Sequence, residues 1–162
     1  MSLRTAVPAC ILALFSGSGC DVLEPTKSSA AIAITVVPNP VVIRVACLAS
    51  VPPPEFCLAS LDPTITVAET GGVGGKIEMI ELVVRNTATN TEEGRVGLDS
   101  AWVREQAGTD RIEARGSLAF RPVVEGYRVR NGAVPALMFT ISVRFLDDNG
   151  HEISQTLQVG GA

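Results

Sequence analysis

His151, the one histidine in the 162-residue sequence, follows the polar run Asp147-Asp148-Asn149-Gly150. A histidine beside carboxylates could act as a general base, and the oxygens of this run could contribute to a calcium site. A single histidine builds no metal cluster, the spaced acidic pattern of an EF-hand is missing, and no G-x-S-x-G serine elbow occurs after residue 19. We therefore expect a hairpin turn over residues 147–150 with His151 at the surface. A weak calcium site completed by another loop is the alternative.

A glycine-rich segment, Thr70–Ile77, superficially resembles a phosphate-binding loop. That motif would require glycine where Thr70 stands and serine or threonine where Ile77 stands. It would also require a helix after the loop, whereas the residues that follow alternate as a strand does. The segment is therefore expected to be a turn or a bulge.

The N-terminal stretch has the pattern of an export signal. Met1–Thr5 carries one positive charge and no acid, and Ala6–Phe15 is apolar apart from Pro8. This apolar core is about half of the roughly 20 residues that a membrane span needs. A basic start, a short apolar core and small residues after it predict a signal peptide over residues 1–19 that is removed. A buried N-terminal strand or helix is the alternative.

The residues Gly17-Ser18-Gly19-Cys20 resemble the lipobox of bacterial lipoproteins, in which small residues precede a cysteine that becomes the lipidated N-terminus. The resemblance implies a diacylglycerol in thioether linkage on Cys20, usually with a further acyl chain such as palmitate on its amine. Two or three acyl chains make membrane attachment stable. Gly17 stands where such families usually have an aliphatic residue, and ordinary signal cleavage nearby is the alternative. Residues 20–30 are then a polar, flexible tether that could hold a domain roughly 15–20 Å from the bilayer.

Four cysteines occur in the sequence, and this N-terminal processing leaves an even pair for the folded part. Cys10 is lost with the signal and Cys20 carries the lipid, so Cys47 and Cys57 remain. Disulfides can form in an exported protein. The spacing of Cys47 and Cys57 fits neither a CxxC redox site nor a zinc knuckle. We expect a structural disulfide worth about 3 kcal/mol in the chain-entropy model, with two buried free thiols as the alternative.

From Ala31 onward, apolar residues recur at every second position, which is the period of a strand with one buried face. One predicted strand is Val41–Cys47, with Cys47 pointing into the core. A change of phase at Met79–Ile80 predicts a bulge or a bend there. Further strands are predicted over Val96–Trp102 and over Ile112–Phe120. No stretch of ten or more residues shows helical spacing.

The expected fold is all-β: a single immunoglobulin-like antiparallel β-sandwich of about seven to nine strands over residues 31–162. The rhythm of strands is similar to that of the immunoglobulin-like and fibronectin-type-III-like modules on many bacterial surface lipoproteins. The Cys–Trp–Cys order of antibody domains is absent, because both cysteines precede Trp102.

The formal net charge of −4 disfavours nucleic acid as a partner, so the lipid on Cys20 would provide the attachment to a membrane. We expect a non-enzymatic lipoprotein of the bacterial cell envelope, on the periplasmic or cell-surface side of a membrane, without a cofactor, catalytic residue or metal site. It would act by contact with an unknown envelope protein, for example through an edge strand. The first alternative is a module that binds calcium or carbohydrate with the loops at Gly71–Gly75 and Asp147–Gly150. The second is an enzyme with a site assembled from loops.

Overall fold

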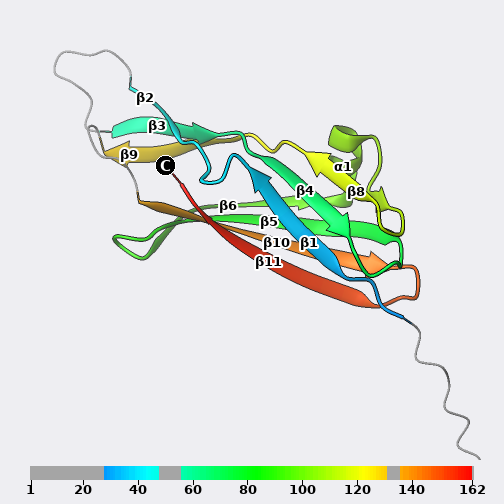
Figure 1. Ribbon diagram of the computed structural model, residues 1–162. Helices are drawn as coiled ribbons and strands as arrows, with labels where there is room; N and C mark the ends of the chain where they lie inside the picture. The colour runs from blue at the N-terminus through cyan, green and yellow to red at the C-terminus, as the bar shows by residue number, and fades with distance from the viewer. Residues whose placement is uncertain (1–27, 48–55, 131–135, 162) are drawn as a thin grey trace, which may run out of the picture.

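The computed structural model describes residues 28–47, 56–130 and 136–161. The predicted signal peptide, Cys20 and most of the tether lie outside these ranges. The described chain is mostly strand with one short helix, so the predicted all-β fold is confirmed (Figure 1). The elements are β1 (Ile32–Val37), β2 (Arg44–Ala46), β3 (Phe56–Leu61), β4 (Thr64–Glu69), β5 (Gly75–Asn86), β6 (Thr91–Asp99), α1 (Ser100–Ala107), β7 (Arg111–Ile112), β8 (Ser117–Phe120), β9 (Val124–Arg130), β10 (Leu137–Asp147) and β11 (Glu152–Gly160).

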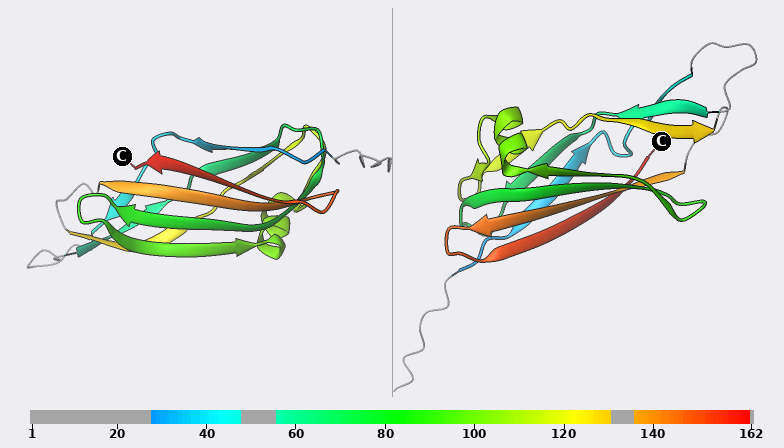
Figure 2. Two further views of the ribbon diagram at one scale, coloured as in Figure 1. Left: turned by 90° about the horizontal axis from the view of Figure 1, so that it is seen from below. Right: turned by 180° about the vertical axis from the view of Figure 1, so that it is seen from behind.

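Antiparallel sheets form two layers around the core. One sheet has the order β1-β4-β8, and the other has the order β11-β10-β5-β6, with β7 paired to β5. Figures 1 and 2 show the first sheet lying across the second. A third sheet has the order β2-β3-β9 and lies at the far end of the domain, where β3 leads into β4 and β9 follows β8 (Figure 1). The largest fully buried side chains are almost all aliphatic or aromatic: Phe145, Ile65, Ile77, Ile80, Ile112, Ile141, Val41, Val67, Val84, Val103, Val143 and Pro122.

Burial of every second residue characterises the central strand β10. Its odd-numbered residues from Leu137 to Phe145 are all buried, and β10 pairs with β5 on one side and β11 on the other. The turn after Asp147 joins β10 to β11, as the Asn-Gly pair predicts.

The predicted bulge lies in β5, one residue before its expected position. Arg144 of β10 pairs with Met79 and Phe145 pairs with Ile77, so Glu78 is the extra residue. The bulge changes the phase of the strand, and both Ile77 and Ile80 are therefore buried.

The predicted strand Val96–Trp102 is wrong beyond Asp99, where the chain turns into α1. The Asp99 carboxylate caps the helix by accepting a hydrogen bond from the backbone N–H of Trp102 at 2.8 Å. Gly108, in the left-handed conformation, ends the helix and donates its N–H to the carbonyl of Arg104 at 2.9 Å. Trp102 packs edge-on against Phe120, with ring centroids 6.1 Å apart. Within residues 28–47, 56–130 and 136–161, no helix could span a membrane.

The predicted single strand Ile112–Phe120 is two strands in different sheets. β7 pairs with β5, and β8 pairs with β4. The chain changes sheets through a turn in which Arg115 has a φ of 61° and Gly116 donates its N–H to the carbonyl of Glu113. Alternation of residue types alone does not reveal such a turn.

The predicted strand Val41–Cys47 is shorter than expected and differently placed. Only Arg44–Ala46 is a strand, and all three of its residues are exposed. Cys47 is exposed as well, so the prediction that it points into the core is wrong, whereas Cys57 is buried. β2 extends past the two packed layers, and its apolar residues therefore find no core to enter.

Candidate functional site

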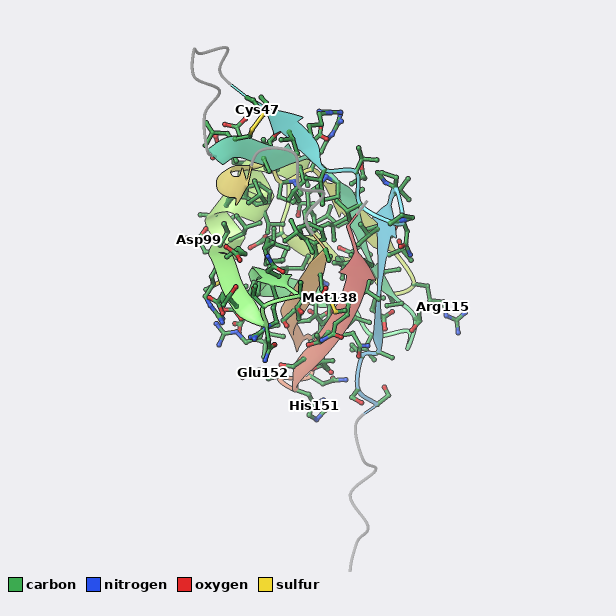
Figure 3. All side chains as sticks on the ribbon, turned by 90° about the vertical axis from the view of Figure 1, so that its left-hand side faces the viewer. Cys47, Asp99, Arg115, Met138, His151 and Glu152 are labelled. Atoms are coloured by element: carbon green, nitrogen blue, oxygen red, sulfur yellow. A yellow bond between two sulfur atoms is a disulfide. The ribbon has the colours of Figure 1, made fainter. Side chains whose placement is uncertain are left out.

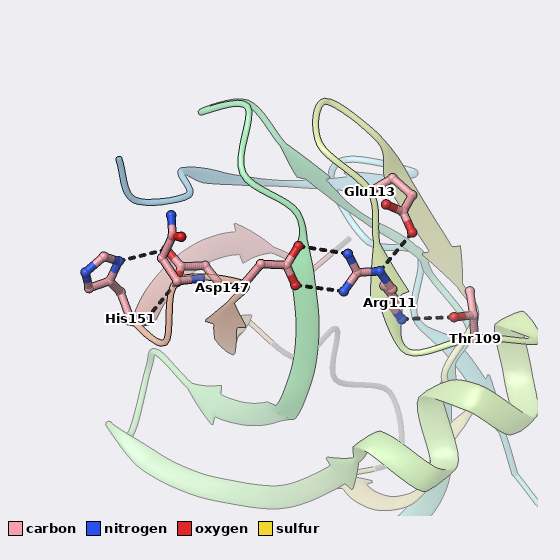
Figure 4. Close-up of polar contacts among 7 residues, drawn as sticks. Thr109, Arg111, Glu113, Asp147 and His151 are labelled. Carbon is pink, nitrogen blue, oxygen red and sulfur yellow. Dashed lines mark hydrogen bonds and ion pairs between the residues drawn. The ribbon is translucent and has the colours of Figure 1, made fainter. Parts of the chain in front are cut away.

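The Asp147 side chain lies at the turn between β10 and β11 and is fully buried. One carboxylate oxygen accepts the backbone N–H groups of Asn149 at 2.9 Å and His151 at 2.8 Å. The other accepts the backbone N–H of Ala30 at 3.1 Å and contacts Nδ1 of the His151 ring at 3.0 Å. The carboxylate therefore holds its own turn and also the N-terminal segment. Figure 4 shows Asp147 beside His151 in this turn.

Glu69, the last residue of β4, has the same role in the neighbouring turn and is only 2% exposed. Its Oε1 accepts N–H groups from Ala31 at 3.3 Å and Gly71 at 2.6 Å. Its Oε2 accepts N–H groups from Gly72 at 2.9 Å and Arg115 at 2.8 Å. Four backbone donors from three segments of the chain thus converge on one side chain.

Two adjacent residues, Ala30 and Ala31, are therefore each held by a different buried carboxylate. We call Glu69 and Asp147, together with the backbone of Ala30 and Ala31, the N-terminal clamp. Thr70 adds a backbone hydrogen bond of 2.7 Å from its N–H to the carbonyl of Ala31. The glycine at position 71 is required by this close approach, because a Cβ there would lie 2.7 Å from the backbone nitrogen of Ala31.

Both carboxylates of the N-terminal clamp are charged at neutral pH. Burial raises the pKa of Glu69, but the N–H groups of Arg115, Gly72, Ala31 and Gly71 outweigh burial and lower its pKa to about 2. Burial likewise raises the pKa of Asp147, and hydrogen bonds from the His151 and Ala30 backbone, the His151 ring and the Asn149 backbone lower it to about 2. The charge on each carboxylate stabilises the fold through these donors.

An ion pair closes the same end of the domain. Arg111 makes two parallel hydrogen bonds of 2.8 Å to the Asp148 carboxylate, and its Nε donates to Glu113 at 2.8 Å (Figure 4). The hydrogen bonds from Arg111 lower the pKa of Asp148. The Asp148 backbone N–H also donates to the carbonyl of Gly74 at 2.9 Å, which joins the glycine-rich turn to the hairpin.

The predicted calcium ligands are thus largely used within the protein. Asp147 accepts hydrogen bonds on both oxygens, and Asp148 is paired with Arg111. Among the described residues, no group of three or more histidine, cysteine, aspartate or glutamate side chains could hold a metal ion. The calcium site stays a prediction, and the described residues near this turn offer no additional group of ligands for it.

His151 lies at the surface of the hairpin, as predicted, with 45% of its side chain exposed. Its ring contacts the buried carboxylate of Asp147, an arrangement that orients a histidine base in hydrolases. Within the described ranges no serine hydroxyl forms a hydrogen bond to the ring. The structure therefore brings together two of the three members of such a set.

Cys47 and Cys57 form the predicted disulfide, with their Cα atoms 4.4 Å apart. Figure 3 shows Cys47 at one end of the domain and His151 at the other, beside the N-terminal segment. Cys20, the predicted lipid site, lies outside the described residues.

Sequence reasoning missed Glu69 entirely. Two of the donors to its carboxylate, Ala31 and Arg115, lie 38 and 46 residues away along the chain, so no local pattern signals the site. One sequence signal was available, namely an acidic residue at the inward phase of a strand, separated by Thr70 alone from the pair Gly71-Gly72.

No protein-family model matches this sequence, and no curated protein matches it. Among solved structures, the chain is similar to the Northeast Structural Genomics Consortium target SoR45, with a TM-score of 0.52 and 13% identity over 79% of this chain and 85% of that chain. It is also similar to the putative ApaA protein from Bordetella pertussis, with a TM-score of 0.50 and 9% identity over 82% of this chain and 94% of that chain. At these identities the likeness shows a shared fold alone.

Proposed function

We propose that this protein is a lipid-anchored, non-enzymatic module of the bacterial cell envelope, with an immunoglobulin-like sandwich that acts by contact with another protein. The proposed anchor is the diacylglycerol on Cys20 that the lipobox resemblance implies. The observation that carries the proposal is the N-terminal clamp, which holds the chain at Ala30, the last residue of the predicted tether, and at Ala31.

The clamp limits how the domain would sit on a membrane. An extended chain spans at most about 3.5 Å per residue, so the segment from Cys20 to Ser28 reaches no more than about 30 Å. Asn149 also holds the chain at Ser28, because its side-chain amide donates a hydrogen bond to the carbonyl of Ser28 at 2.6 Å. Under the proposal, the end with His151 faces the bilayer and the end with Cys47 faces away from it (Figure 3).

The use of the polar side chains supports contact rather than catalysis. The carboxylates of Glu69 and Asp147 hold backbone segments together, and Asp148 is paired with Arg111. These groups stabilise the end of the domain where the chain enters. They fix the N-terminal segment, which follows the proposed anchor, to the body of the domain.

Metabolic labelling with a radioactive or clickable fatty acid tests the anchor. We expect label on the wild-type chain and none on the Cys20→Ala variant, which would also leave the membrane fraction. Cys10→Ala is the matched control, because this cysteine lies in the predicted signal and its loss should leave labelling unchanged. Undiminished label on Cys20→Ala would overturn the proposal.

A further inference from the structure

The exposed large apolar side chains of the described chain all lie toward the end of the domain that is opposite the N-terminal clamp. β1 runs from the clamp toward this distal end, and β2, β3 and β9 lie there (Figure 1). The exposed fractions are 65% for Val37, 49% for Val42, 45% for Val45, 53% for Leu58 and 62% for Val123. Exposed apolar side chains gathered in one region commonly mark an interaction surface.

A groove of about 340 Å³ lies among these residues, between the end of β1, the chain leading to β2, and the link from β3 to β4. We call it the distal groove and define it by Val37, Val41, Val42, Arg44, Asp62 and Arg121. Val41 is 1% exposed, and Val37 and Val42 present apolar surface to solvent. The apolar lining of the groove would accept an aliphatic side chain.

Two arginines in the distal groove share a single carboxylate. Nη1 of Arg44 lies 3.1 Å from Oδ2 of Asp62, and Nη2 of Arg121 lies 2.8 Å from the same oxygen. Arg121 also donates from Nε to the Asp62 carbonyl at 3.3 Å. A guanidinium carries five N–H donors, so most of the donors of both arginines are not used by these bonds. The groove therefore carries one net positive charge in a chain whose formal net charge is −4.

The strand beside the groove has an unpaired edge. β2 pairs with β3 on one side, and no described strand pairs with its other side. Because no described strand pairs with this side of Arg44–Ala46, its backbone N–H and C=O groups are where an added strand would pair. Side chains of an added strand alternate between the two faces of the sheet, and those on the face that carries the Arg44 side chain would lie beside the apolar and basic residues of the groove.

We propose that the distal groove binds an extended segment of another envelope protein, in which an aliphatic side chain lies next to a carboxylate. The aliphatic side chain would pack against Val37 and Val42, and the carboxylate would accept hydrogen bonds from Arg44 and Arg121. This proposal rests on the proposed function, since it identifies where the protein contact is made. A second copy of the chain that docks groove to groove fits less well, because both distal grooves carry the same positive charge.

A displayed library of random dodecapeptides tests this chemistry against the full chain in detergent micelles. We expect the enriched peptides to carry aspartate or glutamate beside aliphatic residues. Synthetic versions of these peptides should lose at least about tenfold in affinity for Arg121→Gln and for Val42→Asp. Arg95→Gln is the matched control, because Arg95 is also an exposed, ion-paired arginine but lies on the other sheet. All three positions are exposed, and an unchanged melting temperature would show that each variant folds.

Several results would overturn the proposal. These are a lack of enrichment, enriched peptides without acidic residues, or affinity that Arg121→Gln leaves unchanged. Concentration-dependent dimerisation that Val42→Asp abolishes would replace the peptide by a second copy. Binding to phosphatidylglycerol vesicles that Arg121→Gln abolishes would replace it by a membrane surface. The selection does not depend on the lipid of Cys20, so its failure is distinguishable from failure of the anchor in the labelling experiment.

Discussion

Replacement of Glu69 by glutamine should destabilise the domain far more than a surface substitution of the same kind. The amide –NH₂ of glutamine would take the place of one carboxylate oxygen, and each oxygen accepts two backbone N–H groups. Two partly buried N–H groups would then lose their acceptor, at about 1–3 kcal/mol each. We expect a loss of roughly 3 kcal/mol in the free energy of unfolding, and a melting temperature lower by about 10 °C for a domain of this size.

Urea and thermal unfolding of the full chain, followed by Trp102 fluorescence and circular dichroism, would measure the effect. Glu105→Gln is the control, because Glu105 is exposed on α1 and should change the stability by less than about 0.5 kcal/mol. A loss below about 1 kcal/mol for Glu69→Gln would refute the reasoning, since it would mean that the four N–H groups do not depend on the carboxylate.

The other predictions concern pH, packing and capping. Folding lowers the pKa of Glu69 from 4.5 to about 2, so the contribution of its charge to stability is complete above about pH 5 and is lost as the pH falls toward 2. The melting temperature of the wild-type protein should therefore fall more between about pH 5 and about pH 2 than that of Glu69→Gln. Gly71→Ala should lower the free energy of unfolding by about 2 kcal/mol, because the new Cβ would lie 2.7 Å from the Ala31 nitrogen. Gly97→Ala is the control: its Cβ has a nearest contact of 3.7 Å, so the same denaturation assay should find the stability little changed. Asp99→Ala should remove the cap of α1, lower the stability by about 1 kcal/mol and alter Trp102 fluorescence; an unchanged melting temperature would contradict the capping role.

Alternating residue types predict the strands well where one face is continuously buried. β10 is the clearest case, because it lies at the centre of its sheet and every second side chain enters the core. The hairpin after Asp147 and the turn at Gly71–Gly75 are predicted for local reasons, since glycine and asparagine permit tight turns.

Alternation misleads where capping or a turn interrupts it. Val96 and Leu98 continue a strand pattern into Ser100 and Trp102, but Asp99 and Gly108 cap a helix between them. These caps are sequence signals of a helix, although the helix of eight residues is too short for its periodicity to stand out.

The N-terminal clamp could not be predicted from local sequence. Asp147 and Ala30 are 117 residues apart, and their contact depends on the hairpin, the start of β1 and the packing of both sheets. The prediction that Cys47 points into the core was wrong for a related reason, since the burial of a side chain depends on whether another layer covers that face of the strand.

Mass spectrometry of the mature N-terminus tests the proposed lipid anchor most directly. Trypsin would release Cys20–Lys27 as a single peptide, because Lys27 is the first basic residue after Cys20. The account predicts that this peptide begins at Cys20 and carries the mass of a diacylglycerol in thioether linkage, and that the Cys20→Ala chain yields no lipidated peptide. A mature chain that begins at another residue, or an unmodified Cys20, would contradict it.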